Sequence, residues 1–259
     1  MKRLNLLCAA FTCLITFCAT AGQKKLDVQL ENNRWEVTIG EELFTAVNFR
    51  GSDRSFLYPI IGPTGANMTR HYPMKEGVEG ESKDHPHHQS LWFAHGGVNG
   101  IDFWHKRKNT GKAEQHSAGV TARKNTYSTL YTNGAWIDAK RNPIAQYVTN
   151  YRFELLDDGS RVIDCSTNIK PSDGIGQLLF ADTKEGTMAI RLAPQLRLKG
   201  EVATGKAINS NGDKDAKVWG KRAKWVAYWG VIDGKTCGVA IFDHPTNLRH
   251  PTWWHARDY

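Results

Sequence analysis

Histidines are concentrated in one short stretch of the chain. Residues 84–105 contain five of the ten histidines and begin with Asp84-His85-Pro86-His87-His88. Alternate side chains of an extended backbone point to the same side, and Pro86 favours an extended conformation at His85. His85 and His87 would then face one side together. Imidazoles in this pattern, next to carboxylates, can bind a metal ion or transfer protons near neutral pH.

Three interpretations of residues 84–105 stay open. As a metal site, His85 and His87 would bind a divalent cation, and a nearby histidine or aspartate would complete the coordination shell. As an acid–base site, a neutral histidine would move a proton while a carboxylate orients its ring. In the structural interpretation the imidazoles only hydrogen-bond the backbone of a rigid loop. The candidates for catalysis are His87, His88, His95, Asp84 and Asp102.

A second segment near the end of the chain has a similar composition. It contains Asp243-His244-Pro245 and the run His250–Asp258. Tryptophans adjoin the polar groups of both segments, and flat aromatic faces beside hydrogen-bonding side chains suit a sugar ring. Arginines can hold a carboxylate or hydroxyl groups. We expect the two segments to meet at one end of the domain. The candidate substrate-binding residues are Arg70, Trp92, Trp104, His105, His250, Trp254, His255 and Arg257.

Short β-strands are the elements expected to position these segments. Runs rich in β-branched and aromatic residues alternate with turn residues, and Asp157-Asp158-Gly159 is typical of a hairpin turn. The expected strands cover residues 34–39, 43–49, 56–61, 127–131, 147–156, 161–169, 187–192, 225–232 and 238–242. This spacing predicts an all-β sandwich or barrel. Its long loops, residues 62–109 and 244–259, would carry the function.

The N-terminus has the three parts of an export signal. Lys2 and Arg3 form a basic head, residues 4–18 are an apolar run, and Ala19-Thr20-Ala21 is a small-residue cleavage pattern. The apolar run is shorter than the about 20 residues of a spanning helix. We expect a signal peptide over residues 1–21 and a periplasmic or secreted protein. Residues 22–259 would form a single domain without a membrane span.

The net charge limits the classes of partner, and the number of cysteines limits the number of disulfides. The chain carries a net charge of +8 at pH 7, yet Lys221-Arg222-Ala223-Lys224 is its only tight basic cluster and no nucleic-acid-binding motif accompanies it. We therefore expect no nucleic-acid partner. For an exported protein, a sugar or an acidic polysaccharide is the better match. Cys165 and Cys237, which remain after signal cleavage, would form one disulfide or pack separately as small apolar groups.

Several segments together resemble a bacterial family of exported proteins that is often labelled "methane oxygenase PmoA". These are Tyr58-Pro59, residues 62–65, 68–70, 84–104, 189–194 and 242–259. The resemblance covers nearly the whole mature chain. It implies a large β-sandwich of the galactose-mutarotase (supersandwich) type and, because members occur in polysaccharide-degrading bacteria, work on carbohydrates. Members usually continue past the segment that ends at Tyr259, which implies a chain truncated at its C-terminus.

These observations predict an exported carbohydrate-active protein. The main hypothesis is an enzyme that hydrolyses, eliminates or epimerises a sugar by histidine–aspartate acid–base chemistry. One alternative is a glycan-binding protein with the same pocket and no turnover. The other is the metal-dependent oxygenase of the family label, which requires copper or iron at the histidines of residues 84–105.

Overall fold

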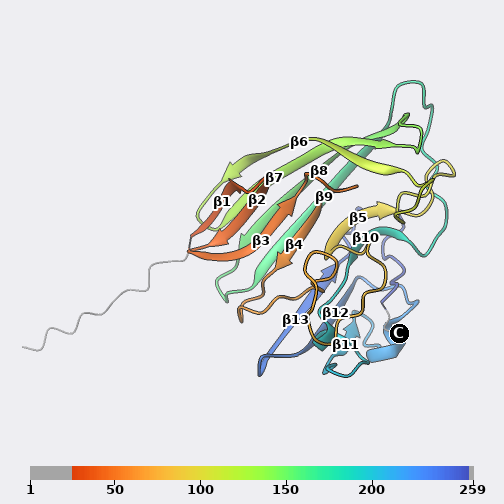
Figure 1. Ribbon diagram of the computed structural model, residues 1–259. Helices are drawn as coiled ribbons and strands as arrows, with labels where there is room; N and C mark the ends of the chain where they lie inside the picture. Colours follow the sequence, from red (N-terminus) through yellow and green to blue (C-terminus); the bar gives the residue numbers. More distant parts are fainter. Residues whose placement is uncertain (1–24, 257–259) are drawn as a thin grey trace, which may run out of the picture.

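Two antiparallel sheets pack face to face in a β-sandwich (Figure 1). The computed structural model describes residues 25–256, so the expected signal peptide and Arg257 lie outside the described residues. The first sheet has the order β1 (Leu26–Glu31), β2 (Arg34–Ile39), β3 (Glu42–Asn48), β4 (Phe56–Ile60), β5 (Leu91–His95), β10 (Gly186–Ile190). The second has the order β6 (Lys112–Arg123), β7 (Tyr127–Ile137), β8 (Pro143–Leu155), β9 (Arg161–Pro171).

A third, smaller sheet packs beside the sandwich. It consists of β11 (Lys206–Asn209), β12 (Trp225–Ile232) and β13 (Lys235–Phe242). Two single-turn 3₁₀ helices, η1 (Pro194–Leu196) and η2 (Asp215–Val218), flank it. Leu196, Ile232 and Cys237 belong to the same apolar core as the sandwich. No helix of residues 25–256 is long and apolar enough to span a membrane.

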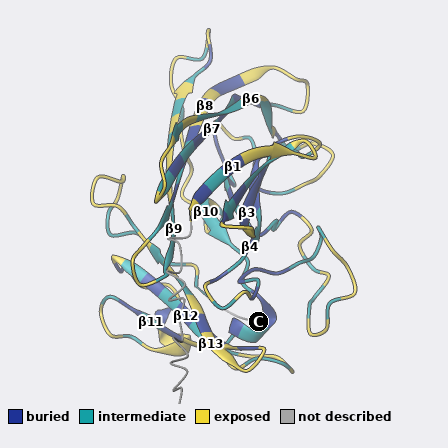
Figure 2. Cartoon of the chain, turned by 90° about the vertical axis from the view of Figure 1, so that its left-hand side faces the viewer, coloured by how far each residue is buried: buried dark blue, intermediate teal, exposed yellow. Residues whose placement is uncertain are grey.

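The core lies between the two large sheets because alternate residues of each strand point inward. Val37 and Phe44 of the first sheet share this core with Leu130 and Phe153 of the second. The Phe44 and Phe153 rings meet edge to face, with centroids 6.1 Å apart. Figure 2 shows the buried residues along these facing strands. The predicted all-β sandwich is confirmed.

The strands predicted from the sequence are present, some of them longer than expected. The hairpin at Asp157-Asp158-Gly159 joins β8 to β9, with Leu155 opposite Arg161 and Gly159 at φ +84°. Four strands, β1, β5, β6 and β11, were not predicted. Of these, β5 lies inside the segment 62–109 that was expected to be a loop, and β6 is an edge strand whose polar residues hide any apolar alternation. Cys165 and Cys237 are both free thiols, so the structure shows no disulfide between them.

Gly134 of β7 allows a bulge in the neighbouring β6. The register shifts between Gln115 and Ser117, so His116 has no partner across the strand pair. A Cβ atom at Gly134 would overlap the carbonyl oxygen of Glu114. We expect Gly134→Ala to lower the free energy of unfolding by about 2 kcal/mol, as overpacking does, measured by urea denaturation. Gly176→Ala is the matched control, because the φ of Gly176 lies outside the left-handed region and no atom lies within 4 Å of an added Cβ; an equal or larger loss there would contradict the role of the bulge.

The outer face of the first sheet carries a separate apolar layer. Phe93 of β5 points into the sandwich and contacts Trp136, whereas its neighbours Trp92 and Ala94 point outward. Trp92 and Ala94 pack there with Phe56 and Trp104. The long segments before and after β5 cover this layer. They hold most of the predicted site residues.

Candidate active site

Three aromatic rings form a stack that runs from the surface to the outer apolar layer. The His85 ring stacks on that of His88 with centroids 4.8 Å apart, and His88 stacks on Trp92 at 5.0 Å. His85 is exposed, while Trp92 is only 3% exposed and Trp104, beside it, 7%. Trp92 and Trp104 therefore support the histidines from below. Neither of them offers to a sugar the open face that was expected from the sequence.

The segment from His85 to His88 is a tight turn, so the prediction of an extended backbone is wrong. The backbone N–H of His88 donates to the carbonyl oxygen of His85 at 2.9 Å, and His85 has φ +45°. Positive φ is costly for a residue with a side chain and is concentrated at functional sites. The turn still brings His85 and His87 together, with ring centroids 5.5 Å apart. Turn geometry, and not strand alternation, makes them neighbours.

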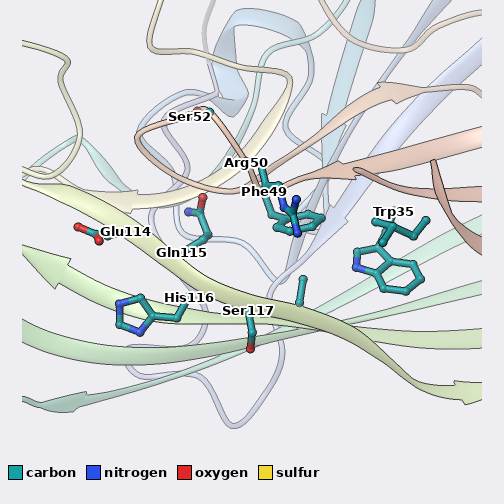
Figure 3. A pocket seen from close by; sticks show the side chains of 11 residues that line it. Trp35, Phe49, Arg50, Ser52, Glu114, Gln115, His116 and Ser117 are labelled. Atoms are coloured by element: carbon teal, nitrogen blue, oxygen red, sulfur yellow. The ribbon is translucent and has the colours of Figure 1, made fainter. Parts of the chain in front are cut away.

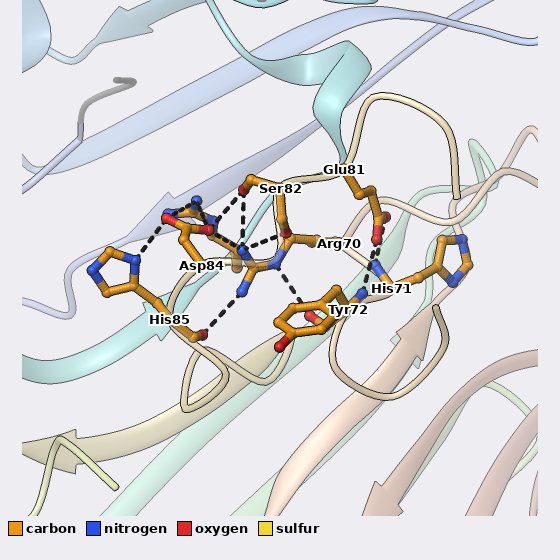
Figure 4. A network of polar contacts seen from close by, with 8 residues as sticks. Arg70, His71, Tyr72, Glu81, Ser82, Asp84 and His85 are labelled. Atoms are coloured by element: carbon orange, nitrogen blue, oxygen red, sulfur yellow. Dashed lines mark hydrogen bonds and ion pairs between the residues drawn. The ribbon is translucent and has the colours of Figure 1, made fainter. Parts of the chain in front are cut away.

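Asp84 is held by Arg70, as Figure 4 shows, and by Arg191. Its carboxylate accepts hydrogen bonds from Arg70 at 2.5 Å, Arg191 at 3.1 Å and Ser82 at 2.7 Å. Although burial opposes its ionisation, the hydrogen bonds from Ser82 and His85 and the charges of both arginines hold the pKa of Asp84 well below its usual range. Asp84 is a carboxylate at every physiological pH.

Arg70 is a structural residue of this network. It is only 2% exposed. Besides Asp84, its guanidinium donates to the carbonyl oxygens of Tyr72, Ser82 and His85. The donation to His85 fixes the strained turn. Arg70, predicted to hold a substrate, instead positions Asp84 and His85.

Two histidines are each paired with a carboxylate. Asp84 Oδ2 lies 2.6 Å from His85 Nδ1, and Asp102 Oδ2 lies 2.8 Å from His105 Nδ1. Asp102 also accepts the backbone N–H of His105, and such bonds overcome the opposing effect of burial and keep the pKa of Asp102 below its usual range. An ionised carboxylate cannot donate, so each Nδ1 carries the proton. The Nε2 atoms of His85 and His105 can then accept a proton.

His87 lies next to both carboxylate–histidine pairs. Its ring centroid is 5.0 Å from that of His105 and 5.5 Å from that of His85. The side chain is nearly buried and its Nε2 has no hydrogen-bond partner within the described part of the chain. Burial, with the nearby His105 and Arg54, lowers the pKa of His87 to about 4. His87 is a neutral imidazole near pH 7.

Arg54 is a buried cation beside these groups. It is 3% exposed, and its Nη1 has no hydrogen-bond partner among residues 25–256. Burial lowers its pKa to about 10, while the charges of Asp53 and Asp102 oppose that shift. A buried cationic group with an unsatisfied donor is costly. No motif surrounds Arg54, so it was not predicted. Arg191 was equally missed as a site residue, although it lies in a segment that carries the family resemblance.

The buried histidines make the folded state sensitive to acid. Burial is the main cause that lowers the pKa of His87 to about 4 and of His88 to about 2, against about 6.5 when unfolded. Between pH 6.5 and 4 the unfolded chain therefore binds more protons, and the free energy of unfolding falls as the pH falls. We expect His87→Asn to flatten this slope in urea titrations at pH 7 to 4. An unchanged slope would contradict the lowered pKa, and His244→Asn, at an exposed histidine outside the site, should leave the slope as in the wild type.

The remaining predicted residues lie elsewhere. His95 ends β5 at the opposite side of the strand from Trp92; its Nε2–H donates to the carbonyl oxygen of Ala181 at 2.9 Å. His250 pairs with Asp243 at 2.9 Å, and Trp254 Nε1–H donates to Ala223. The His255 ring packs near Trp219. These hydrogen bonds of His95, His250 and Trp254 do not involve His85, His87, His88 or His105. They therefore show no contact between residues 84–105 and the segment near the end of the chain.

The described residues do not fit a metal site. No group of three or more histidine, cysteine, aspartate or glutamate side chains in residues 25–256 has an arrangement that could hold a metal ion. His85, one of the two predicted ligands, directs its Nδ1 at Asp84. His85 and His87 therefore do not form the predicted metal site with other described residues.

The fold and the site define a β-sandwich protein with a loop-borne cluster of histidines and carboxylates over the outer face of one sheet. The chain belongs to the family of unknown function DUF6807, which matches residues 34–259. No curated protein and no solved structure matches the chain. The likeness to galactose mutarotases and the methane oxygenase label therefore stay predictions.

Proposed function

We propose that this chain is an exported enzyme that moves a proton on a sugar or glycan, in a hydrolysis, elimination or epimerisation. The observation that carries the proposal is the pair of carboxylate-oriented histidines, His85 and His105, which both contact the neutral His87. A carboxylate on Nδ1 fixes the tautomer and stabilises the imidazolium that forms when Nε2 accepts a proton. Two such groups in one site can act as base and acid.

The roles of the individual residues follow from their exposure. His85 is exposed and His105 is partly exposed, so a bound ligand can reach their Nε2 atoms. One of them takes the proton as general base and the other returns a proton as general acid. The buried cation Arg54 favours negative charge that develops on the substrate. Asp84, Asp102 and Arg70 orient the histidines and stay out of the proton transfer.

The carbohydrate substrate rests on sequence features. An export signal is expected over residues 1–21, and the family resemblance points to polysaccharide-degrading bacteria. Extracellular glycans are the abundant substrates there, and the basic charge of the chain favours acidic ones.

The proposal is tested by incubating the protein with neutral and acidic polysaccharides in D₂O. Mass spectrometry would detect new reducing ends, unsaturated ends or carbon-bound deuterium, one product for each of the three reactions. His244→Ala is the matched control, because it removes an exposed histidine outside the site. Products that form with wild type and His244→Ala but not with His105→Ala support the proposal. Saccharide binding without any product would favour a glycan-binding protein instead.

A further inference from the structure

An open cleft of about 460 Å³ lies between the first sheet and the edge strand β6 (Figure 3). Its lining does not include His85, His87, His88 or His105. Trp35 of β2, Phe49 and Arg50 form one wall, and residues 114–118 of β6 form the other. The volume is in the range of about 300–1,000 Å³ that ligand sites occupy. Nothing in the proposed acid–base chemistry uses this cleft.

The polar groups of the cleft are held in place before any ligand binds. The Gln115 amide donates to the carbonyl oxygen of Ala113 at 2.7 Å and to the Tyr147 hydroxyl at 3.2 Å, which leaves its Oε1 as an oriented acceptor. Arg50 donates to Asn33 at 3.0 Å and lies over the Phe49 ring at 5.3 Å. Fixed donors and acceptors lower the entropic cost of binding.

The bulge in β6 places a further polar side chain at the cleft. His116 is the extra residue of the bulge, is exposed and lines the cleft. Bulges redirect side chains next to binding sites. The close approach of Gly134 to Glu114 makes this bulge possible.

The lining indicates the chemical class of the ligand. Arg50 and Glu114, the Arg and Glu of the lining, carry opposite charges, so the charge of the lining is close to balanced and does not select a strongly anionic ligand. Trp35 is half-buried and its indole N–H has no hydrogen-bond partner within the described residues. Phe49 is only 7% exposed and Arg50 lies over its ring, so Trp35 is the aromatic side chain of the lining that a ligand can contact. An aromatic side chain beside amide, hydroxyl and imidazole groups matches an apolar face and the hydroxyl edge of a sugar.

The cleft and the histidines lie on two sides of one short loop. Ser52 lines the cleft and its hydroxyl donates to Gln89 at 3.2 Å, next to His88 in the chain. The charge of Arg54, two residues further on, helps to lower the pKa of His87. The charge of Asp102 in turn opposes the lowering of the pKa of Arg54. We infer that the cleft is a second saccharide-binding site, which holds a neutral oligosaccharide without acting on it.

Calorimetry with neutral hexasaccharides of glucose, mannose, xylose and galactose tests the inference. We expect at least one to bind with a Kd on the order of 1 mM or tighter. The double variant Arg50→Ala/His116→Ala, at two positions that line the cleft, should weaken binding about tenfold. Arg152→Ala is the matched control, because Arg152 also lies over an aromatic ring, that of Tyr127, but outside the cleft. It should keep the wild-type Kd.

The same measurement separates the cleft from the proposed active site. His105→Ala should leave the Kd of the neutral hexasaccharide within about twofold of wild type, even if it abolishes turnover. The inference is overturned if no neutral hexasaccharide binds, or if His105→Ala weakens binding as much as the cleft variant. Absence of any product together with cleft binding would contradict the acid–base proposal alone.

Discussion

Replacing His105 by alanine is expected to lower kcat by about 10²- to 10⁴-fold on any glycan that the wild-type protein converts. The variant removes a side chain that is only partly buried, and its Nδ1–H donates to Asp102 at 2.8 Å. The fold should therefore survive, which circular dichroism can check. What is lost is the Nε2 atom that accepts or returns the proton.

Three further variants make this prediction specific. Asp102→Asn should lower kcat less than His105→Ala, because the new amide oxygen can still accept the backbone N–H of Trp104 but no longer stabilises an imidazolium. His85→Ala should also lower kcat, and the double variant His85→Ala/His105→Ala should lose less than the sum of both effects, as groups that act together do. Turnover by His105→Ala at the wild-type rate would contradict the assignment.

The second large effect concerns stability. We expect Asp84→Asn to lower the free energy of unfolding by about 3 kcal/mol, since removing one partner of a buried ion pair leaves an uncompensated charge. The Arg70 side chain is 3% exposed, while that of Asp84 is 37% exposed. The loss of unfolding free energy should therefore lie at the lower end of the range found for buried ion pairs. Urea denaturation at pH 7 measures it.

Asp182→Asn provides the matched control for this substitution. Asp182 forms an ion pair with Arg249 at 3.5 Å, but its side chain is 90% exposed. Exposed pairs contribute at most about 1 kcal/mol, so this variant should unfold nearly as wild type does. Because the folded-state pKa of Asp84 is lowered, its contribution is present above the unfolded pKa of about 3.9 and is lost as the pH falls. Equal stability of Asp84→Asn and wild type at pH 7 would contradict the structural role of Arg70.

Residues 84–105 stood out as a candidate site from composition alone, because five histidines in one stretch are visible without any geometry. The β class followed equally from local patterns, since strands buried on one face repeat every two residues. β8 and β9 illustrate this: their alternation and the turn at Asp157-Asp158-Gly159 are local properties, and the hairpin forms as expected.

Only the tertiary structure decided which of these residues lie together. His85 and His105 are far apart in the chain, and each meets His87 because Arg70 and Arg191 hold Asp84 while Phe103 anchors the other loop in the core. His95 lies between them in sequence, yet strand alternation turns it to the other face of β5. Arg54 has no motif, and its place beside His87 comes from long-range packing. Sequence by itself determined the class of fold and the types of side chain present in residues 84–105. Long-range contacts, which no local pattern encodes, decided which histidines lie in the same site.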